Sequence, residues 1–181
     1  MKRRFDLEFE GIESVWLEFN FPRSSPILVC FVYRAPLEPT CISYLTLLED
    51  MISRANSQVN AKSIVTGDLN FYLLDSPRPY STKSFFSIFK SFGYEQLITK
   101  ATRPISNSHL DHLFVSHTDF VVQPGTLQLC TSDHLPVYVC WKFRSGYCRP
   151  FGHKRFSFRS HKKFCVDSFV HDLSLLPWNT I

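Results

Sequence analysis

The segment Ser63-Ile64-Val65-Thr66-Gly67-Asp68-Leu69-Asn70 decides the fold, because it joins a buried strand to a polar turn. Residues 64–66 are β-branched, which predicts a short buried strand. Gly67 then permits a backbone conformation that other residues avoid. Asp68 and Asn70 follow, and two residues apart in an extended chain their side chains point to the same side. They therefore come together at a strand end, where open α/β sheets tend to form functional sites.

The composition is that of one globular domain. The chain has 181 residues, of which 44% are hydrophobic and 20% charged, and its 18 phenylalanines predict an aromatic core. No apolar run is long enough to span a membrane, and the basic start is not followed by the apolar stretch of a signal peptide. We therefore expect an intracellular protein, nuclear or cytoplasmic, that is not secreted and does not bind a membrane.

The six cysteines predict buried thiols in a reducing compartment rather than disulfides or a zinc site. They have neither a CxxC motif nor the Cys/His spacing of zinc ligands. Cys30, Cys130 and Cys140 lie inside apolar runs, where a thiol behaves as a small hydrophobic group. The remaining three are Cys41, Cys148 and Cys165.

The first part of the chain predicts a hairpin followed by a helix. Residues 1–10 are polar and predict no element. A strand is expected to begin near Ile12, with alternation over 15–19, and the nearly continuous apolar run 27–33 predicts a second strand that is buried on both faces. The turn residues of 21–26 join them as an antiparallel pair. An apolar stripe then predicts a helix over 40–56, and strand–helix–strand indicates an α/β fold.

The chain after Asn70 predicts a loop over 71–81, a short helix over 85–92 that ends at Gly93, and another loop over 99–108. Two of the later strands are expected to pair with each other around the turn Gln123-Pro124-Gly125. The expected strands are 113–115, 120–122, 126–130 and 137–143.

The C-terminal part is basic. The chain carries a net charge of +4, yet from His134 to Val166 it has no acidic residue. A basic block of this kind indicates a phosphate-rich partner, although a solvated linker would carry the same charge. We expect residues 1–143 to form the domain and 144–181 a basic connector, with an amphipathic helix over 164–176. The basic residues are Lys142, Arg144, Arg149, Lys154, Arg155, Arg159, Lys162 and Lys163.

Four polar clusters follow expected strand ends or lie in loops. Each of them alone is more often structural than functional, and an Asx turn at Asp68 explains its own segment equally well. Together they provide the functions that phosphodiester hydrolysis requires, namely an activated water and donors or a cation that stabilise charge on the phosphoryl oxygens. The clusters are Tyr33-Arg34, Asp68 with Asn70, 109–112 and 132–134.

The side chains of these clusters suit different parts of that reaction. Asp68 can align and deprotonate a water, and Asn70 can donate to a phosphate oxygen. His134 can act as an acid or base or, when protonated, as a phosphate clamp, and Asp111 can hold its ring in one tautomer.

The remaining polar candidates would contact the phosphate or a cation. The Tyr33 hydroxyl can donate a hydrogen bond, and Arg34 can contact a phosphate. Asp133 offers hard oxygen ligands of the kind that suit Mg²⁺, which retains several waters and needs few carboxylates.

The succession of motifs resembles the endonuclease/exonuclease/phosphatase superfamily and, more narrowly, the apurinic-type endonuclease domain of LINE-type non-LTR retrotransposons. The tail segments 159–164 and 176–178 are also similar to the connector that leads such endonucleases into a reverse transcriptase. The matching motifs are Tyr33-Arg34-Ala35-Pro36, Gly67-Asp68-Leu69-Asn70, Thr102-Arg103-Pro104, 110–116 and 132–137.

The resemblance implies a four-layered α/β sandwich (DNase I-like) and cleavage of DNA phosphodiesters that depends on Mg²⁺ or Mn²⁺. It implies that Asp133 assists the metal or His134 and that Thr102 lies at the rim of the site, while the substrate contact of Arg34 is expected from its charge. The residues to which it assigns catalytic roles are Tyr33, Asp68, Asn70, Asp111 and His134, with Asn70 binding the phosphate.

The sequence departs from the family before Tyr33. The family carries an Asn and a Glu metal ligand on two strands far upstream of this motif, whereas only about 30 residues precede it here. We therefore expect the C-terminal portion of the domain, with the N-terminal half of the sandwich absent and little or no nuclease activity. The alternatives are a non-catalytic nucleic-acid-binding remnant, a phosphoinositide or sphingolipid phosphodiesterase of the same fold, and a fragment without selected function. Nothing in the sequence indicates an obligate oligomer.

Overall fold

The structure is a computed structural model. It describes residues 1–36, 42–74, 77, 79–128, 132–143 and 164–176. The chain divides into two compact units, residues 1–146 and residues 147–181.

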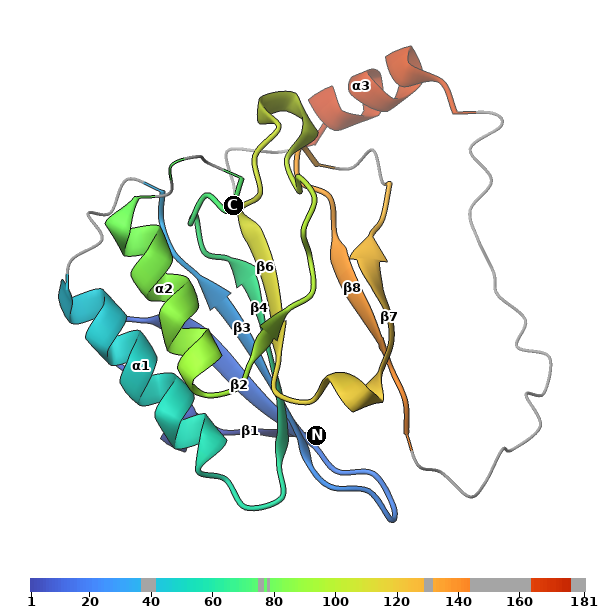
Figure 1. The fold of residues 1–181 in the computed structure, drawn as a ribbon. Helices are drawn as coiled ribbons and strands as arrows, with labels where there is room; N and C mark the ends of the chain where they lie inside the picture. Colours follow the sequence, from blue (N-terminus) through green and yellow to red (C-terminus); the bar gives the residue numbers. More distant parts are fainter. Residues whose placement is uncertain (37–41, 75–76, 78, 129–131, 144–163, 177–181) are drawn as a thin grey trace. The chain divides into compact units, whose positions relative to one another are not determined.

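The first unit is built on a six-stranded sheet (Figure 1). β2 and β3 form the expected antiparallel hairpin, β3 and β4 run parallel, and β4 and β6 run antiparallel. In spatial order the strands are β1 (Lys2–Arg3), β2 (Glu13–Phe19), β3 (Ile27–Tyr33), β4 (Lys62–Asp68), β6 (Asp111–Val115) and β5 (Glu95–Gln96).

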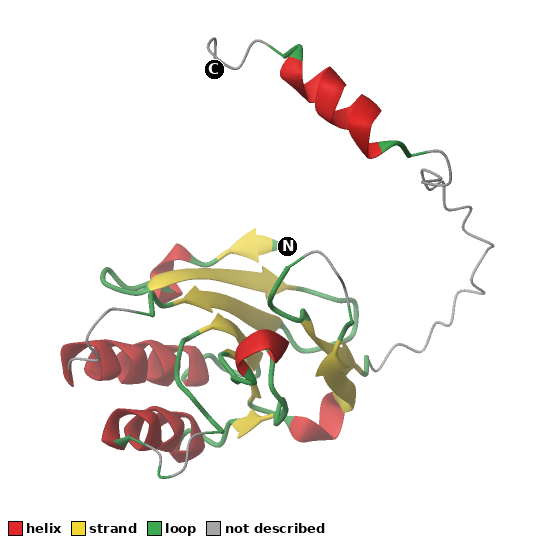
Figure 2. Ribbon diagram, turned by 90° about the horizontal axis from the view of Figure 1, so that it is seen from above, coloured by secondary structure: helices red, strands yellow, loops and turns green. Residues whose placement is uncertain are grey.

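Two helices, α1 (Ile42–Asn56) and α2 (Tyr80–Ser91), lie side by side against one face of this sheet (Figure 2). Their apolar stripes meet alternate side chains of the strands, because successive strand residues point to opposite faces. Phe89 of α2 stacks on Phe114 of β6, with ring centroids 3.7 Å apart. Phe85 stacks on Phe71 in the same way, at 4.1 Å. The predicted aromatic core is therefore confirmed.

The opposite face of the sheet is covered by a two-stranded sheet, β7 (Val121–Thr126) and β8 (Val137–Trp141). The pairing predicted between 120–122 and 126–130 is wrong, because 121–126 is one strand that pairs with β8 instead. Pro124 does not end the strand, since β7 has a partner on only one side and a proline there costs no ladder hydrogen bond. Two 3₁₀ turns, η2 (Pro104–Ser106) and η3 (Thr118–Phe120), lie in the loops on either side of β6.

β3 is not buried on both faces along its whole length, as its apolar run predicted. Phe31 is 50% exposed and Tyr33 is 45% exposed. Both side chains point away from the helices, and in the described part of the chain the β7–β8 pair packs against Ile27 and Val29 but not against these two. The part of this sheet face around Phe31 and Tyr33 is therefore exposed to solvent.

The first ten residues form structure that the sequence did not predict. η1 (Phe5–Leu7) follows β1 and places Leu7 in the core with no exposed surface. Arg4 holds this segment against the sheet, since its guanidinium pairs with Asp6 at 2.7 Å and with Glu18 at 2.6 Å. Phe5, Leu7 and Phe9 alternate with acidic residues, a pattern typical of a strand, so the sequence does not signal a 3₁₀ turn at this position.

The cysteines only partly follow the prediction. Cys30 is buried, but Cys140 and Cys165 are exposed. Cys140 is exposed because it points to the outer face of β8, so an apolar run did not imply burial there. All three are free thiols, and Cys41, Cys130 and Cys148 lie outside the described residues.

The second unit contains one described helix, α3 (Val166–Ser174), where an amphipathic helix was expected. Its apolar residues recur at helical spacing, at Val166, Phe169, Val170 and Leu173. The basic segment 144–163 and residues 177–181 lie outside the described residues. Among the helices that are described, none is long and apolar enough to cross a membrane.

The buried His112 predicts that the protein loses stability in acid. His112 has no exposed surface, and burial lowers its pKa from 6.5 to about 3, with nearby His109 adding to the effect. The unfolded chain binds a proton below about pH 6.5 and the folded chain does not, so the stability is complete above that pH and is lost as the pH falls towards 3. We expect the free energy of unfolding to fall by about 2 kcal/mol between about pH 6.5 and pH 5.

Denaturant titrations at several pH values test this. Replacing His112 with Gln should make the pH dependence shallower, whereas His117→Gln, on an exposed histidine, should leave it unchanged. An equally steep loss of stability in the His112 variant would contradict the prediction.

Candidate active site

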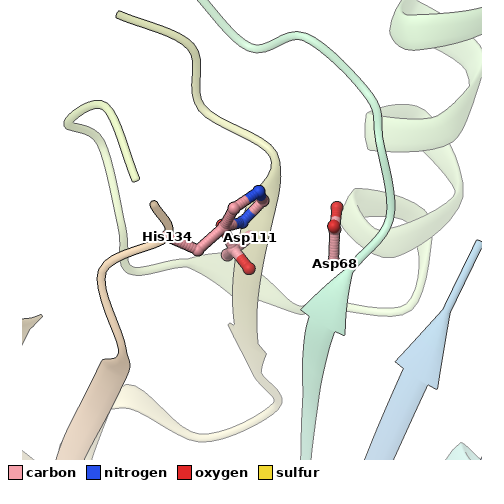
Figure 3. A group of neighbouring side chains, drawn as sticks. All are labelled: Asp68, Asp111 and His134. Atoms are coloured by element: carbon pink, nitrogen blue, oxygen red, sulfur yellow. The ribbon is translucent and has the colours of Figure 1, made fainter. Parts of the chain in front are cut away.

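Asp68 and Asp111 lie side by side at one edge of the six-stranded sheet (Figure 3). Asp68 ends β4 and Asp111 begins β6, and because the two strands run antiparallel these residues are direct partners in the ladder. Both side chains point to the face opposite the helices, since Asp68 is four residues after Ile64 and Asp111 is two residues before Leu113. The sheet register therefore brings two carboxylates together.

His134 completes the group from the loop that precedes β8. Its Nδ1 lies 2.8 Å from Oδ2 of Asp111. When Nδ1–H donates to the carboxylate, Nε2 is left to accept or donate a proton elsewhere. A hydrogen bond at the residue after His134 fixes this loop. The backbone N–H of Leu135 donates to the carbonyl of Thr102 at 2.7 Å. The predicted pairing of Asp111 with His134 is thus present.

Thr102 lies in the protein interior next to this group, and not at the rim of the site. Its side chain has no exposed surface, and its Oγ1 accepts hydrogen bonds from the backbone N–H groups of Leu110 and Asp111, each at 3.1 Å. Burial leaves no surface for a substrate contact, so Thr102 instead fixes the backbone that carries Asp111.

Arg34 is likewise a support of the site and not part of its surface. It is only 5% exposed, its guanidinium lies 4.6 Å from the centre of the Phe71 ring, and Nη1 is 3.4 Å from the carbonyls of Leu69 and Asn70. The predicted contact with a phosphate would need a solvent-facing cation. Arg34 instead contacts the loop after β4 from the protein interior.

Asn70 is turned towards the protein at the same loop. It adopts a left-handed conformation with φ of 51°, which asparagine tolerates better than most residues. Its Nδ2 donates to the carbonyl of Arg34 at 2.7 Å, and its backbone and side chain also donate to Asp68. Asn70 therefore positions the Asp68 carboxylate, and a contact with a phosphate stays a prediction.

The electrostatic environment raises the pKa of the Asp68 carboxyl above its ordinary value. Burial is the largest cause, and the neighbouring Asp111 carboxylate adds to it. His134 and the hydrogen bonds from Asn70 act in the opposite direction. A carboxylate with a raised pKa is a stronger base than an ordinary one, which is the property required for deprotonating a water.

Two further predicted residues lie beside the group. Tyr33 ends β3, and continuing the register of Phe31 with Thr66 by two residues places it next to Asp68. Its half-exposed hydroxyl-bearing ring is on the same face, and its contact with a phosphate stays a prediction. Asp133 is directed elsewhere, because its Oδ2 accepts from Nε and Nη2 of Arg103 at 2.8 and 2.7 Å. That arginine lowers the pKa of the Asp133 carboxyl.

The residues that could hold a metal are Asp68, Asp111 and His134, whose ligand atoms all lie within 4.8 Å of one another. Oδ1 of Asp68 is buried and has no hydrogen-bond partner among the described residues, which is unusual for a carboxylate oxygen and fits a cation ligand. Mg²⁺ prefers oxygen ligands and needs only one or two carboxylates, so Asp68 and Asp111 fit it. Asp133, the metal ligand expected from the sequence, is not in this group.

A thermal melt distinguishes these two assignments of the metal ligands. A bound cation raises the melting temperature by mass action. We expect Mg²⁺ to raise the melting temperature of the wild-type chain and of Asp133→Ala by equal amounts, and to have no effect on Asp111→Asn. A shift that Asp133→Ala removes and Asp111→Asn retains would assign the metal to Asp133 instead.

The sheet, its helical layer and the acidic edge define the class of fold. Comparison with solved structures shows that the chain has the endonuclease/exonuclease/phosphatase fold, which is the predicted DNase I-like architecture. Of its four layers, the described residues form a helical layer, the six-stranded sheet and a two-stranded part of the facing sheet.

One such structure is the endonuclease domain of TRAS1, a telomere-specific non-LTR retrotransposon. It is 17% identical to this chain with a TM-score of 0.60, and the match covers 74% of this chain and 63% of that domain. An endonuclease/exonuclease/phosphatase protein from Beutenbergia cavernae is 17% identical with a TM-score of 0.54, and the match covers 71% of this chain and 38% of that protein. The chain thus spans less than two thirds of either structure. No family model and no curated protein matches it.

Proposed function

We propose that the chain carries the water-activating site of a metal-dependent DNA phosphodiesterase, of the kind found in retrotransposon endonucleases. The observation that carries this proposal is the convergence of Asp68, Asp111 and His134 at one sheet edge. The likeness of the fold to the TRAS1 endonuclease domain favours DNA as the substrate over a phospholipid.

Asp68 acts as the base in this proposal. It takes a proton from a water, whose oxygen then forms a bond to phosphorus in line with the P–O bond that breaks. Asn70 holds the carboxylate through its backbone and side-chain hydrogen bonds. A base that is partly buried and held by hydrogen bonds keeps its orientation, which lowers the entropic cost of aligning the water.

His134 faces the developing negative charge. Its ring is held through Nδ1 by Asp111 at 2.8 Å, and its Nε2 is then directed away from that carboxylate, towards a phosphoryl oxygen. A Mg²⁺ or Mn²⁺ ion at the carboxylates of Asp68 and Asp111 would neutralise charge on the phosphoryl oxygens. Asp68 has two oxygens, so contact with the ion leaves the other available for the water.

The proposal also includes binding partners, which residues 144–181 would contact. The basic character of these residues and their resemblance to the connector of LINE elements suggest contact with nucleic acid and covalent linkage to a reverse transcriptase in a longer protein. Such a protein would act inside the cell.

The test is nicking of supercoiled plasmid by the purified chain. The described residues offer a metal two carboxylates, so we expect slow nicking that needs excess protein and millimolar Mg²⁺. EDTA should abolish it, and His134→Gln should lower the rate about 10²- to 10⁴-fold. DNA binding that weakens with salt but never leads to cleavage would favour the non-catalytic nucleic-acid-binding alternative.

A further inference from the structure

Two consecutive residues, Thr102 and Arg103, hold the loop that carries His134. The carbonyl of Thr102 accepts a hydrogen bond from the backbone N–H of Leu135 at 2.7 Å. Arg103 donates from Nε and Nη2 to Oδ2 of Asp133, at 2.8 and 2.7 Å. Asp133 and Leu135 are the two neighbours of His134 in the chain, so the histidine is held on both sides.

The same two residues also hold Asp111, the partner of His134. Oγ1 of Thr102 accepts from the backbone N–H of Asp111 at 3.1 Å. Arg103 exchanges backbone hydrogen bonds with Ser108, its N–H donating at 3.0 Å and its carbonyl accepting at 3.2 Å, which fixes the start of the segment that leads into β6. Asp111 and His134 are 23 residues apart in the sequence, and the pair Thr102-Arg103 links the two segments that carry them.

The ion pair of Arg103 with Asp133 adds a restraint that the hydrogen bond at Leu135 cannot supply. A single hydrogen bond fixes the chain at one residue, but it leaves the backbone torsions of the residues before it free to change. An attachment on the other side of His134 removes that freedom, and catalytic groups need their geometry held within roughly 0.5 Å and 10–20°. Nδ1 of His134 is thereby kept at 2.8 Å from Oδ2 of Asp111.

The exposure of this ion pair favours positioning over stabilisation as its role. The side chains of Arg103 and Asp133 are 42% and 44% exposed, and an ion pair this accessible to water adds little to the free energy of unfolding. Removing either partner should therefore leave the fold intact and change only the loop that carries His134.

We propose that Arg103 is a positioning residue of the candidate active site, which through Asp133 holds the His134 ring with Nδ1 towards Asp111 and Nε2 towards the phosphate. Arg103 acts on the histidine and not on the reacting atoms. The consequence for catalysis rests on the proposed function, because a ring that turns away from Asp111 loses the tautomer that leaves Nε2 available.

The proton on Nδ1 of His134 gives a readout that does not need catalysis. In the isotope-labelled chain in EDTA, its hydrogen bond to Asp111 should slow exchange with water enough for an NMR signal, which His134→Gln identifies by removing it. We expect this exchange to be roughly 2- to 10-fold faster in Arg103→Ala and in Asp133→Ala. Arg3→Ala is the matched control, because Arg3 is also an exposed, ion-paired arginine but lies on β1, the strand of the sheet farthest from β6. Thermal melts check that each variant is folded.

Nicking of supercoiled plasmid at saturating protein gives the second readout. Arg103→Ala and Asp133→Ala should each lower the rate roughly 2- to 10-fold, and the double variant should lower it no further, because both residues act through one ion pair. If Arg103 were instead a contact to DNA phosphates, the two single variants would change the rate in opposite directions, since one removes a positive charge and the other releases one.

The outcomes separate this inference from the proposed function. Faster Nδ1 exchange in both variants, without nicking by any form of the chain, would support the positioning role while the proposed function fails. Unchanged exchange in both variants would overturn the positioning role even if the wild-type chain nicks DNA. Opposite changes in nicking rate with unchanged exchange would also overturn it, and would assign Arg103 to DNA binding.

Discussion

Gly67→Ala is expected to lower the free energy of unfolding by more than about 4 kcal/mol, which is about half of a typical domain's stability. Gly67 has a φ of +150°, and a Cβ built there would lie 1.8 Å from the carbonyl oxygen of Val32 on the neighbouring strand. The obstacle is backbone in the middle of a sheet, which cannot rotate away as a side chain can. Denaturant unfolding of the two proteins measures the difference.

Gly93→Ala is the matched control for this prediction. Gly93 also has a positive φ, of +76°, but a Cβ there would meet nothing within 4 Å. Gly93→Ala should therefore lower the free energy of unfolding only by the cost of a left-handed backbone for a residue with a Cβ, about 1–2 kcal/mol. Equal losses at the two positions would show that the close approach to Val32 carries no cost, and the register described for β3 and β4 would then be wrong.

Asp68→Asn is expected to lower the single-turnover nicking rate about 10²- to 10⁴-fold with little effect on folding. The amide has the shape of the carboxylate but cannot accept a proton from water. Asp119→Asn is the control, because Asp119 is an exposed acid on η3, beyond the far end of β6. A variant that nicks at the wild-type rate would exclude Asp68 as the base.

The same residue sets the acid limb of the pH profile. The reaction needs the ionised carboxylate, so the rate should fall as the pH drops through the Asp68 pKa. Burial and Asp111 raise that pKa in the metal-free site, whereas a bound Mg²⁺ lowers the pKa of a carboxylate that it contacts. The fall in rate should therefore be displaced to lower pH as the Mg²⁺ concentration rises. Profiles of the nicking rate against pH at two Mg²⁺ concentrations measure this displacement.

The sequence predicted those elements whose signal is local. The alternation over 15–19 predicts a strand and the apolar stripe over 42–56 predicts a helix, and both elements are present. Segment 64–66 lies at the centre of β4 as expected. The burial of Leu7 was missed, and 121–126 was divided by an expected turn at Pro124 although it is one strand, because both depend on partners outside the local segment.

The candidate site was predictable as a set of residues but not as an arrangement. Asp68, Asp111 and His134 were expected together and lie together. Arg34 was expected to contact a phosphate and Thr102 to lie at the rim of the site, yet both are buried, because burial depends on which segments pack against them. Arg103 was noted only as part of a motif, since an ion pair between two loops is visible only in the folded chain.

The antiparallel pairing of β4 with β6 also limits which insertions and deletions the chain can tolerate. Asp68 is opposite Asp111 and Gly67 is opposite His112. Deleting one residue within either strand would exchange the faces, so that the imidazole of His112 would replace a carboxylate at the edge and Asp111 would enter the aromatic core. Length changes should therefore accumulate outside β4 and β6, and the two strands should evolve by substitution alone.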